Sequence, residues 1–218
     1  MVQKEKEKTE FTEVFEKSLM ESPDSREIFD IVKRNSQGRI WIIGGFVYRN
    51  IIKDIYGEIP TPQEIDIDFL IERSSKKRDL YVPEGWDIKI TDYGNPYLLR
   101  GKTRIDLNYL FSFHSIDVRK LRPRFKYFFT GTPLDIQSIA YDLTDTSVGV
   151  TGWRGIDAIK RKSVRINNLE EAKFEASNRG ISLEELVTQK AKELGFECDL
   201  TLPLPQIPKK TYGDVEKS

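Results

Sequence analysis

Residues 64–72, which read EIDIDFLIE, alternate between acidic and apolar side chains before the run becomes wholly apolar. Successive side chains of a strand point to opposite faces, so Glu64, Asp66 and Asp68 share one face and the apolar residues share the other. Carboxylates two residues apart on one strand are roughly 7 Å apart and repel one another. The pattern predicts a strand with one buried face and one face whose charge needs a counter-ion.

A second local signal lies directly upstream. Residues 39–43, RIWII, are β-branched and aromatic, the pair Gly44-Gly45 follows, and apolar residues then recur at helical spacing until Gly57. This order predicts a strand, a glycine turn and a helix. Such a turn lets the backbone approach a phosphate closely and presents free N–H groups of the helix to an anion, although most Gly-Gly pairs are only turns.

Further strands are predicted at 86–91, 96–100 and 103–110, the last two as a hairpin. On the third of them Asp106 shares its face with Arg104 and Asn108, so docking beside the first acidic strand brings a third carboxylate to the cluster. Three carboxylates suit Mg²⁺, which prefers hard oxygen ligands. The alternative is a solvated sheet face on which Arg104 pairs with the acids.

The remaining chain is predicted to be mainly helical. We expect a helical N-terminal extension at 1–36, a core at 37–166, C-terminal helices at 167–200 and a flexible tail at 201–218. Residues 133–142 fit helix and strand templates equally well. The chain is expected to be a single functional unit.

Lysine plus arginine and aspartate plus glutamate number 35 each, so any polyanion must be held by a local patch. Two basic groups, at 119–126 and 154–165, are candidates for phosphate contacts or for plain surface charge. For the first group we favour a solvated loop beside a buried aromatic strand at 127–129.

The single histidine, His114, and the single cysteine, Cys198, argue against a structural zinc site and against a histidine-based triad. Carboxylates must therefore carry any catalysis. His114 is expected near a helix start and Cys198 within the last helix. No stretch approaches the roughly 20 apolar residues of a membrane helix, and a cytoplasmic location without membrane contact is expected.

The wording IIGGFVYRNIIKDIYG followed by EIDIDFLI resembles the head domain of CCA-adding enzymes and bacterial poly(A) polymerases, in the polymerase β-like nucleotidyltransferase superfamily, where a GGxVRD motif precedes DIDI. Later, LDIQSIAYDL resembles the FTINAMAYD segment of those enzymes, and GWRGIDAIKRKSVRI resembles the stretch that ends the head. The resemblance implies an α+β nucleotidyltransferase fold, with a mixed central sheet flanked by helices and with helical N- and C-terminal extensions.

The resemblance also implies a chemistry: transfer of a nucleoside monophosphate from an NTP such as ATP to an acceptor hydroxyl. The acceptor can be RNA, including tRNA, a protein or a small molecule. The implied catalytic and metal-binding residues are Asp66, Asp68 and Asp106, with two Mg²⁺ ions expected and Asp106 also as the base. The implied nucleotide-binding residues are Gly44, Gly45 and Arg49.

Departures from the motifs leave other functions open. Tyr48 stands where GGxVRD has its arginine and Arg49 where it has its aspartate. Gly131-Thr132-Pro133 replaces the RRD that precedes the FTINA-like segment, and no EDxxRxxR motif follows, so CCA addition is not expected. The alternative is a non-catalytic nucleotide-binding or regulatory module of the same fold. A third possibility is a structural protein whose acidic face is merely solvated.

Overall fold

The computed structural model describes residues 2–21, 24–57, 65–72, 80–91 and 94–201 of the 218-residue chain. The helices are α1 Val2–Glu21, α2 Ser25–Asn35, α3 Gly45–Tyr56, α4 His114–Val118, α5 Lys126–Gly131, α6 Trp153–Arg161, α7 Leu169–Arg179 and α8 Leu183–Leu194. The strands are β1 Ile40–Ile43, β2 Ile65–Ile71, β3 Asp87–Ile90, β4 Pro96–Arg100, β5 Thr103–Tyr109, β6 Ala140–Asp142, β7 Val150–Thr151, β8 Ser163–Arg165 and β9 Glu197–Asp199. Two 3₁₀ turns, η1 and η2, span Leu110–Ser112 and Asp135–Gln137.

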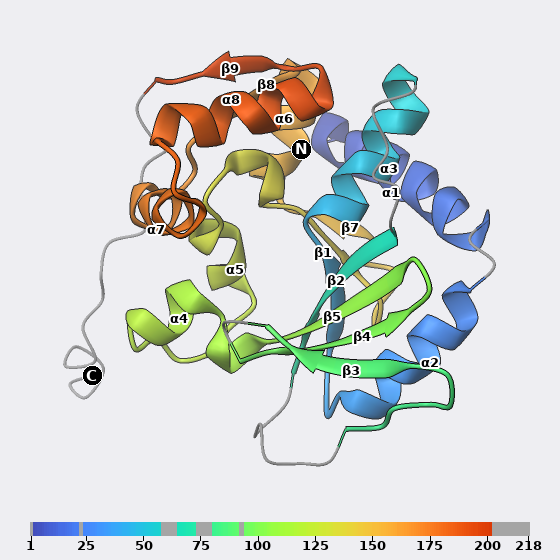
Figure 1. Cartoon of the computed structure of the whole chain (residues 1–218). Coiled ribbons are helices and arrows are strands. Elements are labelled where there is room, and N and C mark those ends of the chain that lie inside the picture. Colours follow the sequence, from blue (N-terminus) through green and yellow to red (C-terminus); the bar gives the residue numbers. More distant parts are fainter. Residues whose placement is uncertain (1, 22–23, 58–64, 73–79, 92–93, 202–218) are drawn as a thin grey trace, which may run out of the picture.

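Seven of these strands form one mixed sheet in the order β3-β4-β5-β2-β1-β6-β7 (Figure 1). Strands β2 and β5 pair in parallel, and every other neighbouring pair of the sheet is antiparallel. Strands β8 and β9 form a separate parallel pair that packs against α8. The predicted α+β architecture with a mixed central sheet flanked by helices is confirmed.

Helices cover the two faces of the sheet unequally. The first face carries Ile67 and Phe69 of β2 and is buried under α1, α2 and α3. On the second face, α4 and α5 bury Trp41 and Leu70 against Phe128. Leu70 shares its face with the two aspartates of β2, so these two short helices cover only one end of that face. At the acidic end Asp66 is exposed and Asp68 is half-buried.

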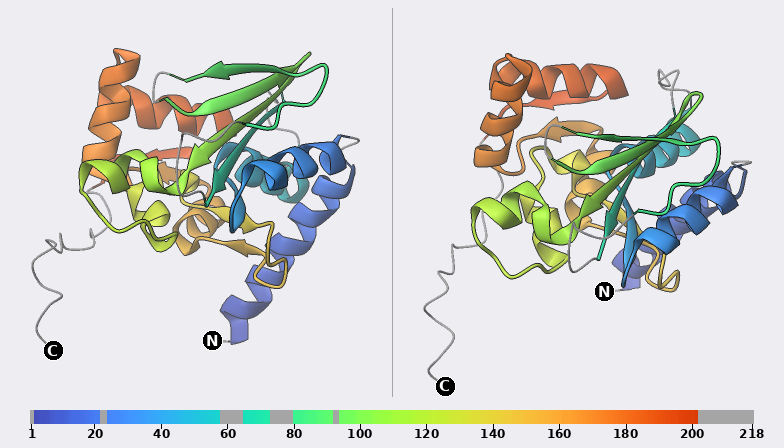
Figure 2. Two further views of the ribbon diagram at one scale, coloured as in Figure 1. Left: turned by 90° about the horizontal axis from the view of Figure 1, so that it is seen from below. Right: turned by 60° about the horizontal axis from the view of Figure 1, so that its bottom comes forward.

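Local capping explains the two C-terminal helices. The Asn168 side chain accepts hydrogen bonds from the backbone N–H groups of Glu170 and Glu171, and Ser182 with Glu185 forms a capping box at α8. Each helix ends at a glycine in the left-handed conformation. Figure 2 shows the two helices on the opposite side of the molecule from α2.

Two assignments made from sequence are wrong. Cys198 lies exposed in β9 rather than in the last helix, because Gly195 ends α8 before it. Residues 127–129 belong to α5 rather than to a strand, because Phe125, Phe128 and Phe129 contact one another at helical spacing over the sheet.

The loop at 58–64, which includes Glu64, and the tail at 202–218 lie outside the described residues. No helix within the described ranges is both long and apolar enough to cross a membrane.

Candidate active site

The parallel pairing of β2 with β5 brings the predicted acidic residues together. Asp68 lies opposite Asp106 and Asp66 lies opposite Arg104 in the register, so all four side chains project from the same face. The predicted docking of the two strands is confirmed. The third member of the predicted row on β2, Glu64, falls outside the described residues.

Arg104 binds the carboxylate of Asp106 through both of its oxygens. Its Nε and Nη2 donate hydrogen bonds of 2.6 and 2.7 Å to the two oxygens of Asp106, and its Nε lies 3.8 Å from an oxygen of Asp66. The guanidinium also sits 4.2 Å over the ring of Tyr97. The hydrogen bond to Asp106 raises the pKa of Arg104. Asp106 is therefore neutralised by its own strand, and among the described residues no three His, Cys, Asp or Glu side chains are grouped so as to hold a metal ion.

Asp68 has no such cation of its own. Its pKa is raised to about 7, first by burial and then by the charges of Asp66 and Asp106, while Arg104 and a hydrogen bond from Asn108 oppose the rise only in part. The amide of Asn108 accepts in turn from Asn95 at 3.2 Å. Asn108 is a site residue that the sequence reasoning missed, although its position two residues beyond Asp106 placed it on the acidic face.

The Gly44-Gly45 turn lies directly beside Asp68. Gly44 precedes α3 with φ +61° and ψ −129°, a conformation that a residue with a Cβ rarely adopts. A Cβ built on Gly44 would lie 3.9 Å from Oδ2 of Asp68. No acidic residue occupies the first turn of α3, so no carboxylate of that turn competes for the N–H groups at the helix N-terminus.

Arg49 reaches across the same turn towards α8. Its Nη1 would be 2.9 Å from a Cβ built on Gly45, and its Nε and Nη2 donate to Glu193 at 3.0 and 2.7 Å. Glu193 also accepts from Lys190 at 2.5 Å. Burial alone raises the pKa of Glu193, but the hydrogen bonds and charges of Lys190 and Arg49 lower it overall. One carboxylate of the C-terminal helices thus holds two cations at the glycine turn.

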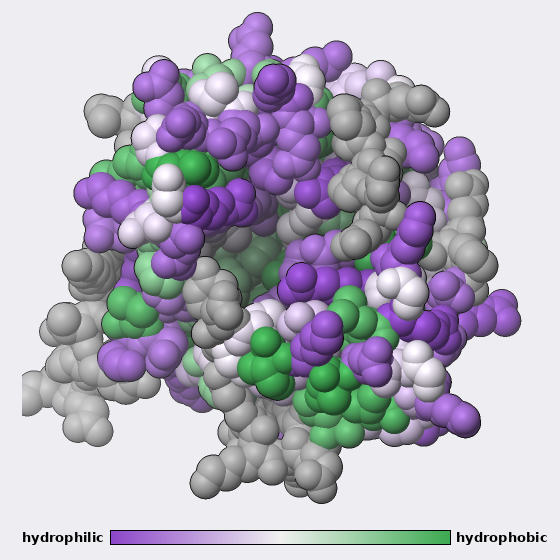
Figure 3. Space-filling model, viewed as in Figure 1, coloured by the Kyte–Doolittle hydropathy of each residue, from purple (hydrophilic) through white to green (hydrophobic). Residues whose placement is uncertain are grey.

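These residues meet in a cleft of about 560 Å³, visible as the hollow near the middle of Figure 3. Its core side is formed by Gly44, Gly45, Arg49, Asp66 and Asp68, and α4, α5, α7 and α8 form the opposite walls. Asp106 lies behind this lining and is only 9% exposed. The cleft therefore joins the acidic strand, the glycine turn and the C-terminal helices.

His114 belongs to the cleft wall. It begins α4, as predicted, and its Nδ1 lies 2.7 Å from a carboxylate oxygen of the buried Glu171 on α7. Its ring stacks on that of Phe174, with the centroids 3.8 Å apart. A single histidine in a polar stretch gave no signal for this position, because both partners lie more than 50 residues away in the sequence.

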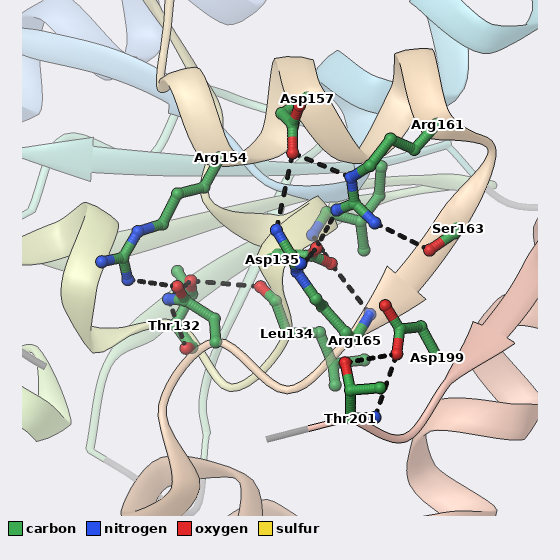
Figure 4. Close-up of polar contacts among 12 residues, drawn as sticks. Thr132, Leu134, Asp135, Arg154, Asp157, Arg161, Ser163, Arg165, Asp199 and Thr201 are labelled. Atoms are coloured by element: carbon green, nitrogen blue, oxygen red, sulfur yellow. Dashed lines mark hydrogen bonds and ion pairs between the residues drawn. The ribbon is translucent and has the colours of Figure 1, made fainter. Parts of the chain in front are cut away.

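The second basic group is largely structural. Arg161 and Arg165 form ion pairs of 2.8 and 3.2 Å with Asp135, which is fully buried. Figure 4 shows both arginines converging on this aspartate from α6 and β8. The buried Arg154 donates to the side chain of Asn167. These arginines hold internal partners and are not free for a phosphate.

Solved structures of similar fold include a tRNA-processing enzyme in two apo forms. The chain is 17% identical to one over 79% of its own length and 44% of that chain, with a TM-score of 0.51, and 17% identical to the other over 80% and 42%, with a TM-score of 0.50. To the structure of a CCA-adding enzyme with ATP, the chain is 17% identical over 80% of its own length and 37% of that chain, with a TM-score of 0.48. The chain spans less than half the length of these proteins.

No family model and no curated protein sequence matches the chain. The structural likeness concerns the fold, and the chain has the nucleotidyltransferase fold that its motifs predicted.

Proposed function

We propose that this chain is a metal-dependent nucleotidyltransferase, which transfers a nucleoside monophosphate from an NTP to an acceptor hydroxyl and releases pyrophosphate. The observation that carries the proposal is the meeting of Asp66 and Asp68 with the Gly44-Gly45 turn at a helix N-terminus in one cleft. The two similar structures with TM-scores of 0.50 and 0.51 are of a tRNA-processing enzyme, which is in keeping with an RNA acceptor.

The carboxylates fit the metal that this fold implies. Asp66 and Asp68 offer hard oxygen ligands in the cleft. The pKa of Asp68 is raised by burial and then by the charges of Asp66 and Asp106, and a bound divalent cation would favour its ionised form. Asp106 fits as a third ligand once Arg104 releases it. The proposed pair of Mg²⁺ ions, when bound, neutralises phosphate charge and polarises the phosphoryl group.

The other roles fall to residues of the chain itself. The Gly44 N–H donates to the carbonyl of Ile139, so the N–H groups at the start of α3 bind the triphosphate. Arg49 contacts the triphosphate oxygens from the side of α3. Asp106, released from Arg104, accepts the proton of the attacking hydroxyl. The walls of the cleft hold the acceptor end against the nucleotide and exclude water from it.

A second candidate function is a nucleotide-binding module without turnover. The bidentate hold of Arg104 on Asp106 favours it, because a carboxylate held in that way can neither bind a metal nor accept a proton. In this case the protein binds an NTP with Mg²⁺ at the glycine turn but transfers no nucleoside monophosphate.

The test is incubation of the purified chain with each of four α-labelled NTPs, Mg²⁺ and total cellular RNA, beside the Asp66→Asn plus Asp68→Asn variant. Label on RNA with the wild type alone establishes the enzyme and its nucleotide. Magnesium-dependent NTP binding without transfer to RNA, to protein or to small molecules supports the second candidate instead.

Mg²⁺ at pH 7.5 is expected to raise the melting temperature by several degrees, because it binds the folded carboxylate pair and not the unfolded chain. The increase should be lost in Asp68→Asn. It should occur at lower Mg²⁺ concentration in Arg104→Gln, in which Asp106 has no competing cation. Differential scanning fluorimetry over a Mg²⁺ titration measures both. An unchanged melting temperature in the wild type would instead support the solvated acidic face.

Arg49→Gln is expected to weaken NTP binding about tenfold or more, because a hydrogen bond to a charged group contributes roughly 1.5–3 kcal/mol. Calorimetric titration with a non-hydrolysable NTP and Mg²⁺ measures the loss. Lys53→Gln, an exposed cation on the last turn of the same helix, is the matched control and should bind as the wild type does. Equal affinities in the two variants would place the triphosphate away from Arg49.

A further inference from the structure

The segment that joins α4 to α5, residues 119–126, reads RKLRPRFK and carries five cations in eight residues. Lys120 pairs with Asp117 at 3.3 Å. Within the part of the chain that the structure describes, Arg122, Arg124 and Lys126 are exposed and have no acidic partner within ion-pair distance. In a chain whose formal charges cancel, this basic segment is a local concentration of unpaired positive charge.

The basic segment is fixed to the core rather than freely solvated. Phe125 stacks on the buried Trp41 with the ring centroids 4.1 Å apart, and Leu121 packs on the same apolar cluster. Between them, Pro123 restricts the backbone that carries Arg122 and Arg124. Cations presented from a fixed backbone lose less conformational entropy when they bind a ligand.

The helices on either side of the basic segment line the cleft. His114 and Asp117 of α4 and Phe128 of α5 belong to the cleft lining, and the basic segment connects these two helices. These two helices thus form part of the cleft wall, and Asp66 and Asp68 also line the cleft. A polymer whose end enters the cleft can therefore continue over this wall.

We infer that the basic segment binds the sugar-phosphate backbone of a single-stranded RNA whose terminal hydroxyl enters the cleft. This inference rests on the proposed function and names its acceptor. A polyanion with one charge on each residue matches closely spaced cations without intervening acids, whereas a protein acceptor would not require them. The one aromatic ring of the basic segment, that of Phe125, packs on Trp41 and Phe129, so the contact is to phosphates and carries no base preference.

The test compares two triple variants of equal charge change. The first is Arg122→Gln with Arg124→Gln and Lys126→Gln. The control is Arg26→Gln with Lys33→Gln and Lys89→Gln, all exposed on α2 and β3. Fluorescence anisotropy measures binding of a labelled single-stranded RNA, without NTP, between 50 and 200 mM salt.

Loss of three phosphate contacts should reduce the slope of log affinity against log salt by about 2, since each contact on a single strand contributes roughly 0.7. Over that fourfold range of salt, the wild type should therefore lose about twentyfold more affinity than the first variant. The control should keep the wild-type slope. If the first variant keeps the wild-type slope, the inference is wrong. It is also wrong if an acidic peptide binds the wild type as tightly as RNA does and its affinity falls by the same factor in the first variant.

The binding assay separates this inference from the proposed function. Asp68→Asn should bind RNA as the wild type does, because it leaves the basic segment unchanged. If the wild type transfers label, the first variant should raise the KM for RNA about tenfold and leave the KM for the NTP unchanged. An unchanged KM for RNA would mean that the acceptor binds elsewhere, and the proposed nucleotidyltransferase activity would be unaffected.

Discussion

Asp68→Asn is expected to abolish nucleotide transfer, with a fall in kcat on the order of 10³-fold, the effect of removing one charged group from a transition-state site. The amide keeps the size of the carboxylate and can still accept from Asn108, but it brings no negative charge to a metal. Single-turnover transfer with saturating NTP and Mg²⁺ measures the loss. The double variant with Asp66→Asn should be little worse, because residues that act as one unit are not additive.

The same substitution is expected to stabilise the fold at neutral pH. The folded-state pKa of Asp68 is raised to about 7, above its unfolded value, so the folded state favours the protonated form. The associated stability is present below about pH 4 and is lost as the pH rises towards 7. With each pKa unit corresponding to about 1.4 kcal/mol and with allowance for partial screening, the gain in Asp68→Asn at pH 7.5 is roughly 2 kcal/mol.

Denaturant unfolding at pH 4 and pH 7.5 separates this effect from a general one. The two proteins should agree at pH 4 and differ at pH 7.5. Asp87→Asn, an exposed aspartate on β3 of the same sheet, serves as the control and should show neither the stabilisation nor the loss of transfer. Transfer at the wild-type rate by Asp68→Asn would mean that the acidic face is only a solvated face.

The sheet and its acidic face could be predicted because a period of two decides which face each side chain takes. That rule placed Asp66, Asp68 and Asp106 together before any contact was known. It could not decide which partner Asp106 takes, because Arg104 and a metal compete for the same oxygens, and the winner depends on rotamers and on the ring of Tyr97.

Contacts between distant segments were beyond any local pattern. Arg49 and Glu193 are separated by 144 positions, and only the packing of α8 against α3 brings them together. The residues of α5 were assigned to a strand because a short aromatic run fits both templates, and burial over the sheet decides between them. Cys198 was misplaced by the few residues by which helix ends are generally uncertain.

Asp135→Ala is expected to lower the free energy of unfolding by about 3–5 kcal/mol, because it removes a fully buried carboxylate and leaves two half-buried guanidinium groups without their shared partner. The carboxylate is fully buried and accepts from Arg161 at 2.8 Å and from the backbone N–H of Ile136 at 2.8 Å. Burial raises the pKa of Asp135 against the pull of Arg165 and Arg161. The two arginines thus offset the cost of burying the carboxylate, and removing either the carboxylate or the arginines destabilises the fold.

Asp157→Ala is the matched control for this loss. Asp157 also pairs with Arg161 at 2.8 Å, but its side chain is 41% exposed, so its removal should cost less than about 1 kcal/mol. Urea unfolding at pH 7 measures both variants. Similar losses for the two would show that burial does not set the strength of this cluster.

The position of Asp135 also gives its loss a functional consequence. The cluster joins η2 to α6 and β8, and β8 packs against α8, the helix that supplies Lys190 to the cleft. Hydrogen exchange in α8 should therefore accelerate in Asp135→Ala before global unfolding, while β2 and β5 keep wild-type protection. If exchange rises equally in the sheet, the C-terminal helices do not respond to this cluster separately from the core, and the acidic strands depend on it as directly as the cleft wall does.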